Sequence, residues 1–203
     1  MPGAHTHDAI TVATGVALAP LAYTTNLALG ESADSALRLT ALFVGAHLLS
    51  GIMFSPDLDL DSAIDNRWGV FYWIWRPYMW AVPHRSRWLS HGLVIPPLLR
   101  LLYFYWVLIG LLIGGAWLLG HAGIAVPDLA SRVGDVVLGT VVRYPRATWA
   151  FLLGFITGSA AHSIADWTVT GGKHYLRQLG FRITRDYGDH DHYRPYGRRR
   201  ARF

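Results

Sequence analysis

Four short polar groups interrupt a strongly hydrophobic chain, and each contains side chains that bind metal ions. They read HTHD at residues 5–8, SPDLDLDS at 55–62, HRSRWLSHG at 84–92 and HSIAD at 162–166. Imidazole nitrogens and carboxylate oxygens together suit zinc, iron or manganese. The donors are numerous enough for one or two ions. The sequence therefore predicts a metal site that combines nitrogen and oxygen ligands from separate parts of the chain.

In two of these groups, the spacing would let two side chains bind the same metal ion. His162 and Asp166 are four residues apart, so on a helix both side chains reach the same point. Asp57 and Asp59 point the same way if their segment is extended. Each pair also has a simpler interpretation. The first could be a pair that stabilises a helix or links two helices, and the second could belong to a solvated loop. The agreement of all four groups, rather than any single pair, favours a metal site.

His84 and His91 are seven residues apart, which on one continuous helix would put them about 10 Å from each other. We expect instead a loop that leads into the next apolar segment, with both histidines as ligands. The alternative is that they lie at lipid headgroups. Asp61 is a candidate general base, and Arg85 is a candidate contact for a phosphate or an oxyanion. Arg85 is equally well explained as a charge that sets membrane topology.

Three further residues have less specific interpretations. His47 lies in the middle of an apolar run, and we predict that it forms interhelical hydrogen bonds rather than binding a metal. Asp8 could interact with the positive end of a helix that begins beside it. His5 has no partner at a defined spacing. The roles of these three residues therefore stay open at the level of the sequence.

The composition indicates a membrane protein. Of the 203 residues 52% are hydrophobic and only 15% are charged, and this balance differs from that of an ordinary soluble domain. There are no cysteines, which excludes disulfides, thiolate metal ligands and a thiol nucleophile. The net charge of +5 arises mainly from the end of the chain, because nine of the eighteen Lys and Arg residues lie from Lys173 onward. We do not expect a nucleic-acid partner, since no folded reader motif is present.

Long uncharged runs predict an all-α polytopic membrane protein with about four transmembrane helices. At about 1.5 Å per residue, each run is long enough to cross a hydrocarbon core of about 30 Å. The predicted spans are Ala9–Gly30, Leu39–Pro56, Leu101–Gly120 and Ala147–Ala165. Two shorter segments, Trp68–Val82 and Pro127–Val142, are predicted to lie at the membrane interface, the first because it is rich in Trp and Tyr and the second because it is amphipathic.

Four spans put both termini, the 57–100 loop and all four polar groups on one side of the membrane. That side would carry fourteen Lys and Arg residues against four on the other, which predicts that the termini are cytoplasmic. We expect a bacterial inner-membrane location, with membrane lipids as partners. Residues 1–170 would form the membrane domain. Residues 171–203 would form a basic, partly disordered tail that adds affinity for an anionic leaflet.

The order of the motifs THD, SGIMFSPDLDLDS, RWG, HRSRWLSHG and HSIADW resembles that of a bacterial family of small membrane proteins described as metal-binding and of unknown function. The resemblance extends to about residue 170. A more distant similarity is to inner-membrane metal-dependent hydrolases. The resemblance implies one metal site formed by seven residues: His7, Asp57, Asp59, His84, His91, His162 and Asp166.

Two functional hypotheses follow. The first is a metal-dependent hydrolase that acts on a phosphoester or a lipid-like substrate at the membrane face, with zinc as the expected ion and manganese or iron as alternatives. The second is a metal-binding membrane protein without catalysis, such as a sensor or an assembly factor. An open coordination position would favour the enzyme, and a closed ligand shell would favour the second hypothesis.

Overall fold

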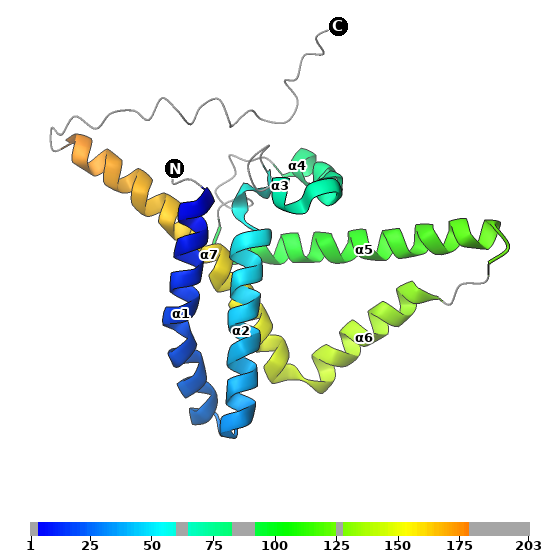
Figure 1. Cartoon of the computed structure of the whole chain (residues 1–203), viewed down its shortest axis with the longest axis horizontal. Coiled ribbons are helices and arrows are strands. Elements are labelled where there is room, and N and C mark those ends of the chain that lie inside the picture. The colour runs from blue at the N-terminus through cyan, green and yellow to red at the C-terminus, as the bar shows by residue number, and fades with distance from the viewer. Residues whose placement is uncertain (1–3, 60–64, 83–91, 125–127, 179–203) are drawn as a thin grey trace, which may run out of the picture.

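The computed structural model describes residues 4–59, 65–82, 92–124 and 128–178, and within these ranges the regular elements are all helices, with no strand among them. The predicted all-α class is therefore confirmed for this part of the chain. Figure 1 shows the arrangement of the elements. In chain order they are α1 (Ala4–Ala28), α2 (Ala33–Met53), the 3-10 helix η1 (Pro56–Asp59), α3 (Asp65–Trp68), the 3-10 helix η2 (Gly69–Trp75), α4 (Arg76–Ala81), α5 (Ile95–His121), α6 (Leu129–Arg143) and α7 (Pro145–Gln178).

Helices α1 and α2 form an antiparallel hairpin, and α7 crosses both of them (Figure 1). The turn between α1 and α2 contains Gly30, whose φ of 86° lies in the left-handed region that a glycine adopts without steric cost. Ser32 then begins α2, because its side chain accepts a hydrogen bond from the backbone N–H of Ser35. These local signals direct α2 back along α1, and α7 packs mainly against α2.

Two glycines allow α7 to approach α2 at backbone distance. A Cβ atom on Gly154 would collide with the carbonyl of Phe43, and one on Gly158 would collide with the carbonyl of His47. Small residues four apart on a helix commonly permit such close helix contacts in membrane proteins. The approach sets the register of α2 against α7 and brings Ser55, just after the end of α2, beside His162 of α7.

His47 links the three helices by hydrogen bonds, as predicted. It is fully buried. Its Nε2 lies 3.1 Å from the carbonyl oxygen of Thr11 and 3.0 Å from the hydroxyl of Thr14, and its Nδ1 lies 3.0 Å from the hydroxyl of Thr157. Because a carbonyl can only accept, the Nε2 carries the proton toward Thr11. Both ring nitrogens of His47 thus have polar partners inside the bundle.

The segment from α3 to α4 packs one side into an aromatic core. Trp75 is fully buried and makes edge contacts with Phe54 and Trp68, and the hydroxyl of Tyr103 on α5 donates to the carbonyl of Ile74. The other side of the segment is also apolar but exposed. Its exposed large side chains are Val70, Phe71, Trp73 and Trp80. The predicted position at a membrane interface stays a prediction, and the structure adds that half of this segment belongs to the core.

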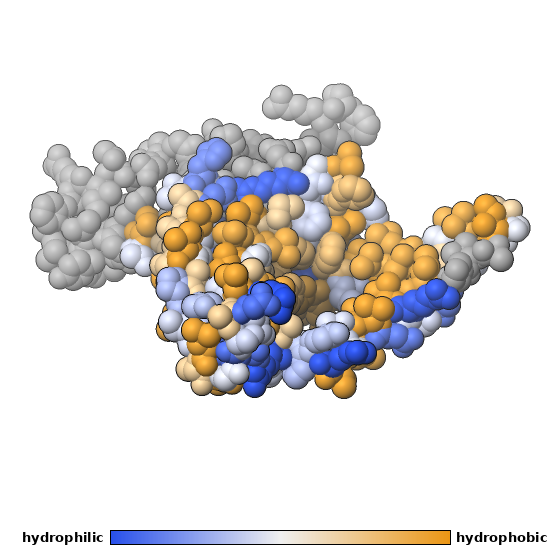
Figure 2. Space-filling model, turned by 60° about the horizontal axis from the view of Figure 1, so that its bottom comes forward, coloured by the Kyte–Doolittle hydropathy of each residue, from blue (hydrophilic) through white to orange (hydrophobic). Residues whose placement is uncertain are grey.

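Helix α5 runs across the direction of α1 and α2 and projects away from them, and α6 returns to the start of α7 (Figure 1). The sequence predicted a surface-lying helix at Pro127–Val142. The helix observed there begins after Asp128, whose carboxylate caps the N–H of Ser131, and no residue of α6 is buried. On the face that Figure 2 shows, orange hydrophobic surface is interrupted by separate blue hydrophilic groups.

Within the described residues, three helices are long and apolar enough to cross a membrane: His5–Ala28, Ala33–Met53 and Ile95–His121. They correspond to the first three predicted spans. The fourth predicted span, Ala147–Ala165, lies inside α7, which is not one of these three helices. Helix α7 continues through residue 170 to Gln178, so the predicted boundary between membrane domain and tail falls inside a helix.

Candidate metal centre

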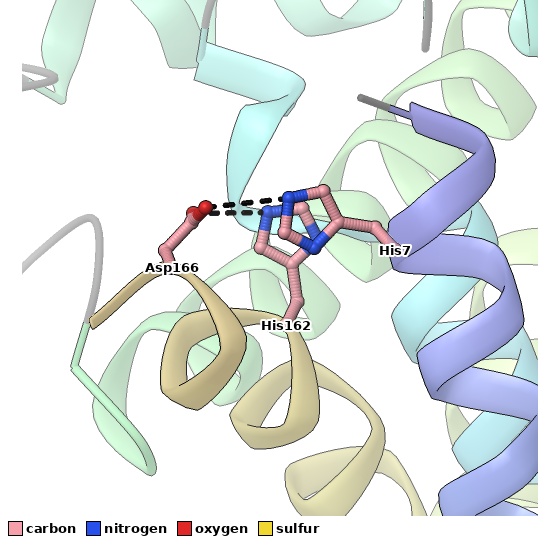
Figure 3. A group of neighbouring side chains, drawn as sticks. All are labelled: His7, His162 and Asp166. Carbon is pink, nitrogen blue, oxygen red and sulfur yellow. Dashed lines mark ion pairs between the residues drawn. The ribbon is translucent and has the colours of Figure 1, made fainter. Parts of the chain in front are cut away.

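Three of the predicted ligands meet where the beginning of α1 lies against α7. His7 projects from the first turns of α1, and His162 and Asp166 project from one face of α7 (Figure 3). The sequence placed His7 before the first helix, whereas α1 begins at Ala4 and includes it. A helical position fixes the direction of the imidazole, and the side chain points at α7 rather than into a loop.

The donor atoms of these three residues converge. His7 Nε2 lies 3.3 Å from Asp166 Oδ1, and His162 Nε2 lies 3.4 Å from Asp166 Oδ2. One ligand atom from each residue falls within 4.8 Å of the other two. The imidazoles of His7 and His162 are stacked, with ring centroids 3.7 Å apart and ring planes 13° apart. Figure 3 shows both rings directed toward the carboxylate.

The cluster is enclosed. The exposed fractions of His7, His162 and Asp166 are 3%, 1% and 4%. Burial raises the pKa of the Asp166 carboxyl, but the imidazoles of His162 and His7 beside it lower that pKa by more, so it lies well below its usual range. Asp166 is therefore an ionised carboxylate at neutral pH, which is the form that binds a cation.

Ser55 supports the cluster from the end of α2. Its hydroxyl oxygen lies 3.4 Å from Nδ1 of His162. A partner at the second ring nitrogen of a ligating histidine fixes the tautomer and the ring orientation. In a metal-bound form, a proton on Nδ1 would leave the lone pair of Nε2, the nitrogen that faces Asp166, for the ion.

The donor set fits a divalent metal ion. Both carboxylate oxygens of Asp166 and the Nδ1 of His7 are buried and make no well-directed hydrogen bond among the residues that the structure describes. Buried polar atoms of this kind are normally satisfied, so their accumulation at one point favours a missing ligand. Two imidazoles and a carboxylate match the preferences of zinc, manganese and iron. The two imidazole planes are nearly parallel, so their nitrogen lone pairs point in the same direction and do not converge. To bind one shared ion, the rings must therefore rotate so that their lone pairs point toward one position.

The described part of the chain does not test the remaining predicted site residues. Asp57 and Asp59 are in η1, and their side chains are outside the description. His84, His91, Asp61 and Arg85 lie outside the described residues altogether. Their predicted roles as ligands, base and anion contact stay predictions. His5 is exposed on the first turn of α1.

Two polar residues beside the cluster had no functional interpretation in the sequence analysis. Arg100 is 1% exposed at the start of α5, and its Nη2 donates to the hydroxyl of Ser159 at 2.8 Å, one turn before His162 on α7. Arg67 binds Asp8, the residue after His7. Both arginines counted only as topology charges in the sequence. Arg67 stands in the RWG motif, which was the signal that could have indicated more, whereas Arg100 lies eight residues after the HRSRWLSHG group and carried no such signal.

A family model described as "Uncharacterized metal-binding protein (DUF2227)" matches residues 2–176. The matched range contains all seven predicted ligands and ends within α7. Searches of the curated proteins and of the solved structures found no match.

Proposed function

The chain belongs to this family of uncharacterized metal-binding proteins, and we propose that it is an integral membrane protein that holds a divalent metal ion between α1 and α7. The observation that carries the proposal is the convergence of His7, His162 and Asp166 at a buried point. Zinc is the proposed ion, with manganese or iron as alternatives, because these ions accept imidazole and carboxylate together.

We infer a membrane arrangement of four spans, formed by α1, α2, α5 and residues 147–165 of α7, with η2–α4 and α6 at the interface. Length and hydropathy support the first three spans. The excess of Lys and Arg supports cytoplasmic termini in a bacterial inner membrane. Because α5 runs across α1 and α2 (Figure 1), its passage through the membrane is the most informative part of this arrangement to test.

Reporter fusions test the arrangement. A reporter that is active only outside the cytoplasm is expected to be active when inserted after Gly123, between α5 and α6, and inactive when fused after Phe203. A cytoplasmic reporter should give the opposite pattern. Activity of the same reporter type at both positions would mean that α7 does not cross the membrane, and would overturn the four-span arrangement.

We propose that the bound ion serves the hydrolysis of a phosphoester or a lipid-like substrate. A divalent ion supplies a Lewis acid and a nucleophile at neutral pH. A catalytic zinc site keeps one coordination position open. In this proposal His7, His162 and Asp166 hold the ion, Asp61 accepts a proton, and Arg85 orients the anionic group of the substrate. Asp57, Asp59, His84 and His91 complete the ligands, for one ion or two.

The enclosure of the cluster favours a second candidate, a metal-binding membrane protein without catalysis. Side chains that are 1–4% exposed leave little room for a substrate at the donor atoms. A sensor or an assembly factor would use the same three residues with a closed ligand shell. The two candidates differ in whether bound metal supports turnover, and an assay on purified protein separates them.

The experiment uses the full chain in detergent, loaded with Zn²⁺ or Mn²⁺, with a chromogenic phosphodiester and phospholipid micelles as substrates. The hydrolase proposal predicts turnover that a chelator abolishes and that added metal restores. Asp59→Ala and His91→Ala are each expected to lower metal affinity about tenfold or more and to reduce turnover in parallel. Stoichiometric metal without turnover on either substrate would favour the second candidate. Unchanged affinity in both variants would remove these two residues from the ligand set.

A further inference from the structure

The contact between Arg67 and Asp8 joins the end of one helix to the beginning of another. Arg67 Nη2 donates to Asp8 Oδ2 at 2.6 Å, and Arg67 Nη1 donates to the carbonyl of Ile52 at 2.7 Å. Asp8 lies on α1, and Ile52 lies in the last turn of α2. One guanidinium group therefore connects α1 and α2 on the same side of the molecule as the metal centre.

The last turn of α2 explains why a cation lies there. The final carbonyls of a helix have no intrahelical donors, and the partial negative charge at a helix C-terminus attracts cations. Arg67 donates to one of these carbonyls, and the indole Nε1 of Trp68 donates to the next, that of Met53, at 2.9 Å. The tryptophan ring also packs edge-on against Phe54. Two hydrogen bonds thus fix Arg67 and Trp68 on the end of α2, and in this position the guanidinium of Arg67 also contacts Asp8.

Asp8 is the neighbour of His7, which lies only three residues after the start of α1 at Ala4. The first turn of a helix frays, because its N–H groups lack partners and few side chains hold it. A ligand in that turn would move with it. The bond from Arg67 ties the side chain of Asp8, the residue after His7, to the end of α2, and Ser55 lies beside His162 just beyond that end.

We propose that Arg67 is a positioning residue of the metal centre: by holding Asp8 on the end of α2, it keeps His7 facing His162 and Asp166. This inference rests on the proposed binding of a metal by that cluster. Arg67 and Asp8 are partly exposed, with side-chain exposures of 21% and 30%, so the ion pair itself adds little to the stability of the fold. Its effect is expected in metal affinity, because a ligand held in place does not lose freedom when the ion binds.

Arginine suits this role better than lysine. The planar fork presents separate donors to Ile52 and Asp8, whereas an ammonium group is a single compact charge. Arg67→Lys is therefore expected to keep part of the effect, and Arg67→Met is expected to remove it. Arg146→Met is the matched control, because Arg146 also pairs with an acidic residue of another segment, Glu31, but near the α1–α2 turn at the opposite end of α1.

The experiment titrates the full chain in detergent with Co²⁺, whose absorption spectrum reports both affinity and ligand set. Arg67→Met is expected to weaken Co²⁺ binding about tenfold, as residues that orient ligands typically do. At saturation its spectrum should match that of the unchanged protein, because no ligand has been removed. Arg67→Lys should give an intermediate affinity, and Arg146→Met should bind as the unchanged protein does. Asp8→Asn should weaken binding similarly, and the double variant should be no weaker than either single one.

A purely structural role predicts a different pattern. In that case Arg67→Met would lower the melting temperature of the metal-free protein and leave the Co²⁺ affinity unchanged. Unchanged affinity in Arg67→Met, together with lost binding in His162→Ala, would overturn the positioning role and leave the proposed metal site intact. Full binding in His162→Ala would overturn the proposed site and the positioning role with it.

Discussion

His162→Ala is expected to remove bound metal from the purified protein and to weaken metal binding by about 100-fold or more. His162 supplies one of three donors that converge at the buried point between α1 and α7. Loss of a residue that merely orients a ligand already weakens binding by about 10–100-fold, so loss of the ligand itself should exceed that range. Elemental analysis gives the metal content, and a Zn²⁺ titration against a competing chelator gives the affinity.

Asp166→Asn provides a second, nearly isosteric variant for the same site. It keeps the size of the side chain but removes the negative charge that lies 3.3 Å and 3.4 Å from the two histidines. It should therefore lose metal without leaving a cavity, and it separates a lost ligand from a damaged fold. The control is His121→Ala, because His121 is an exposed histidine at the end of α5 with its Nδ1 on the carbonyl of Trp117. Full metal content in both site variants would refute the site.

The site could be predicted only in part from local spacing. The separation of four residues between His162 and Asp166 places both side chains on one helical face wherever that helix lies. The contact with His7 depends on how α1 packs against α7, more than 150 residues later in the chain, and no local pattern determines such a contact. The family resemblance included His7, but the sequence placed it in front of the helix. The structure extends α1 to Ala4 and makes His7 a helical residue.

Backbone partners explain why Arg67 was missed. Because a sequence displays side chains and not backbone contacts, Arg67 was predicted only as a charge on the positive side of the membrane. The acceptor that fixes Arg67 is the carbonyl of Ile52, which the sequence does not display. The aromatic segment after Arg67 was also ambiguous for a physical reason. It is apolar on both sides, so its composition could not show which side contacts the core and which is exposed.

The long uncharged runs predicted helices well, because a helix of a soluble protein is usually shorter and carries charged residues on one face. Glycine positions were less informative. Gly110 and Gly114 in α5 have the same spacing as Gly154 and Gly158 in α7, but only the second pair lies against another backbone. The spacing of small residues shows that another helix could approach closely. Whether a helix does so, and which one, becomes evident only from the packing.

Gly158→Ala is expected to destabilise the protein by about 3 kcal/mol, the upper part of the usual range for overpacking. A Cβ atom at this position would overlap the carbonyl group of His47, which belongs to a helical backbone and cannot rotate away. The helices must separate instead. In an open helical position the same substitution favours folding by about 0.5–1 kcal/mol, because alanine restricts the unfolded chain. Gly158→Ala is therefore expected to lower the free energy of unfolding, whereas the same substitution at an open helical position raises it. Unfolding of the metal-free protein in detergent measures this change.

Gly139→Ala is the matched control for this effect. Gly139 is also helical, in α6, and nothing lies within 4 Å of its added Cβ, so its substitution should be neutral or slightly stabilising. The same separation of α2 from α7 should move Ser55 away from Nδ1 of His162 and weaken metal binding, although Gly158 contacts no ligand. Equal stability of the two variants would show that α2 and α7 do not meet at backbone distance. In that case the contact that aligns Ser55 with the metal centre would have to be assigned elsewhere.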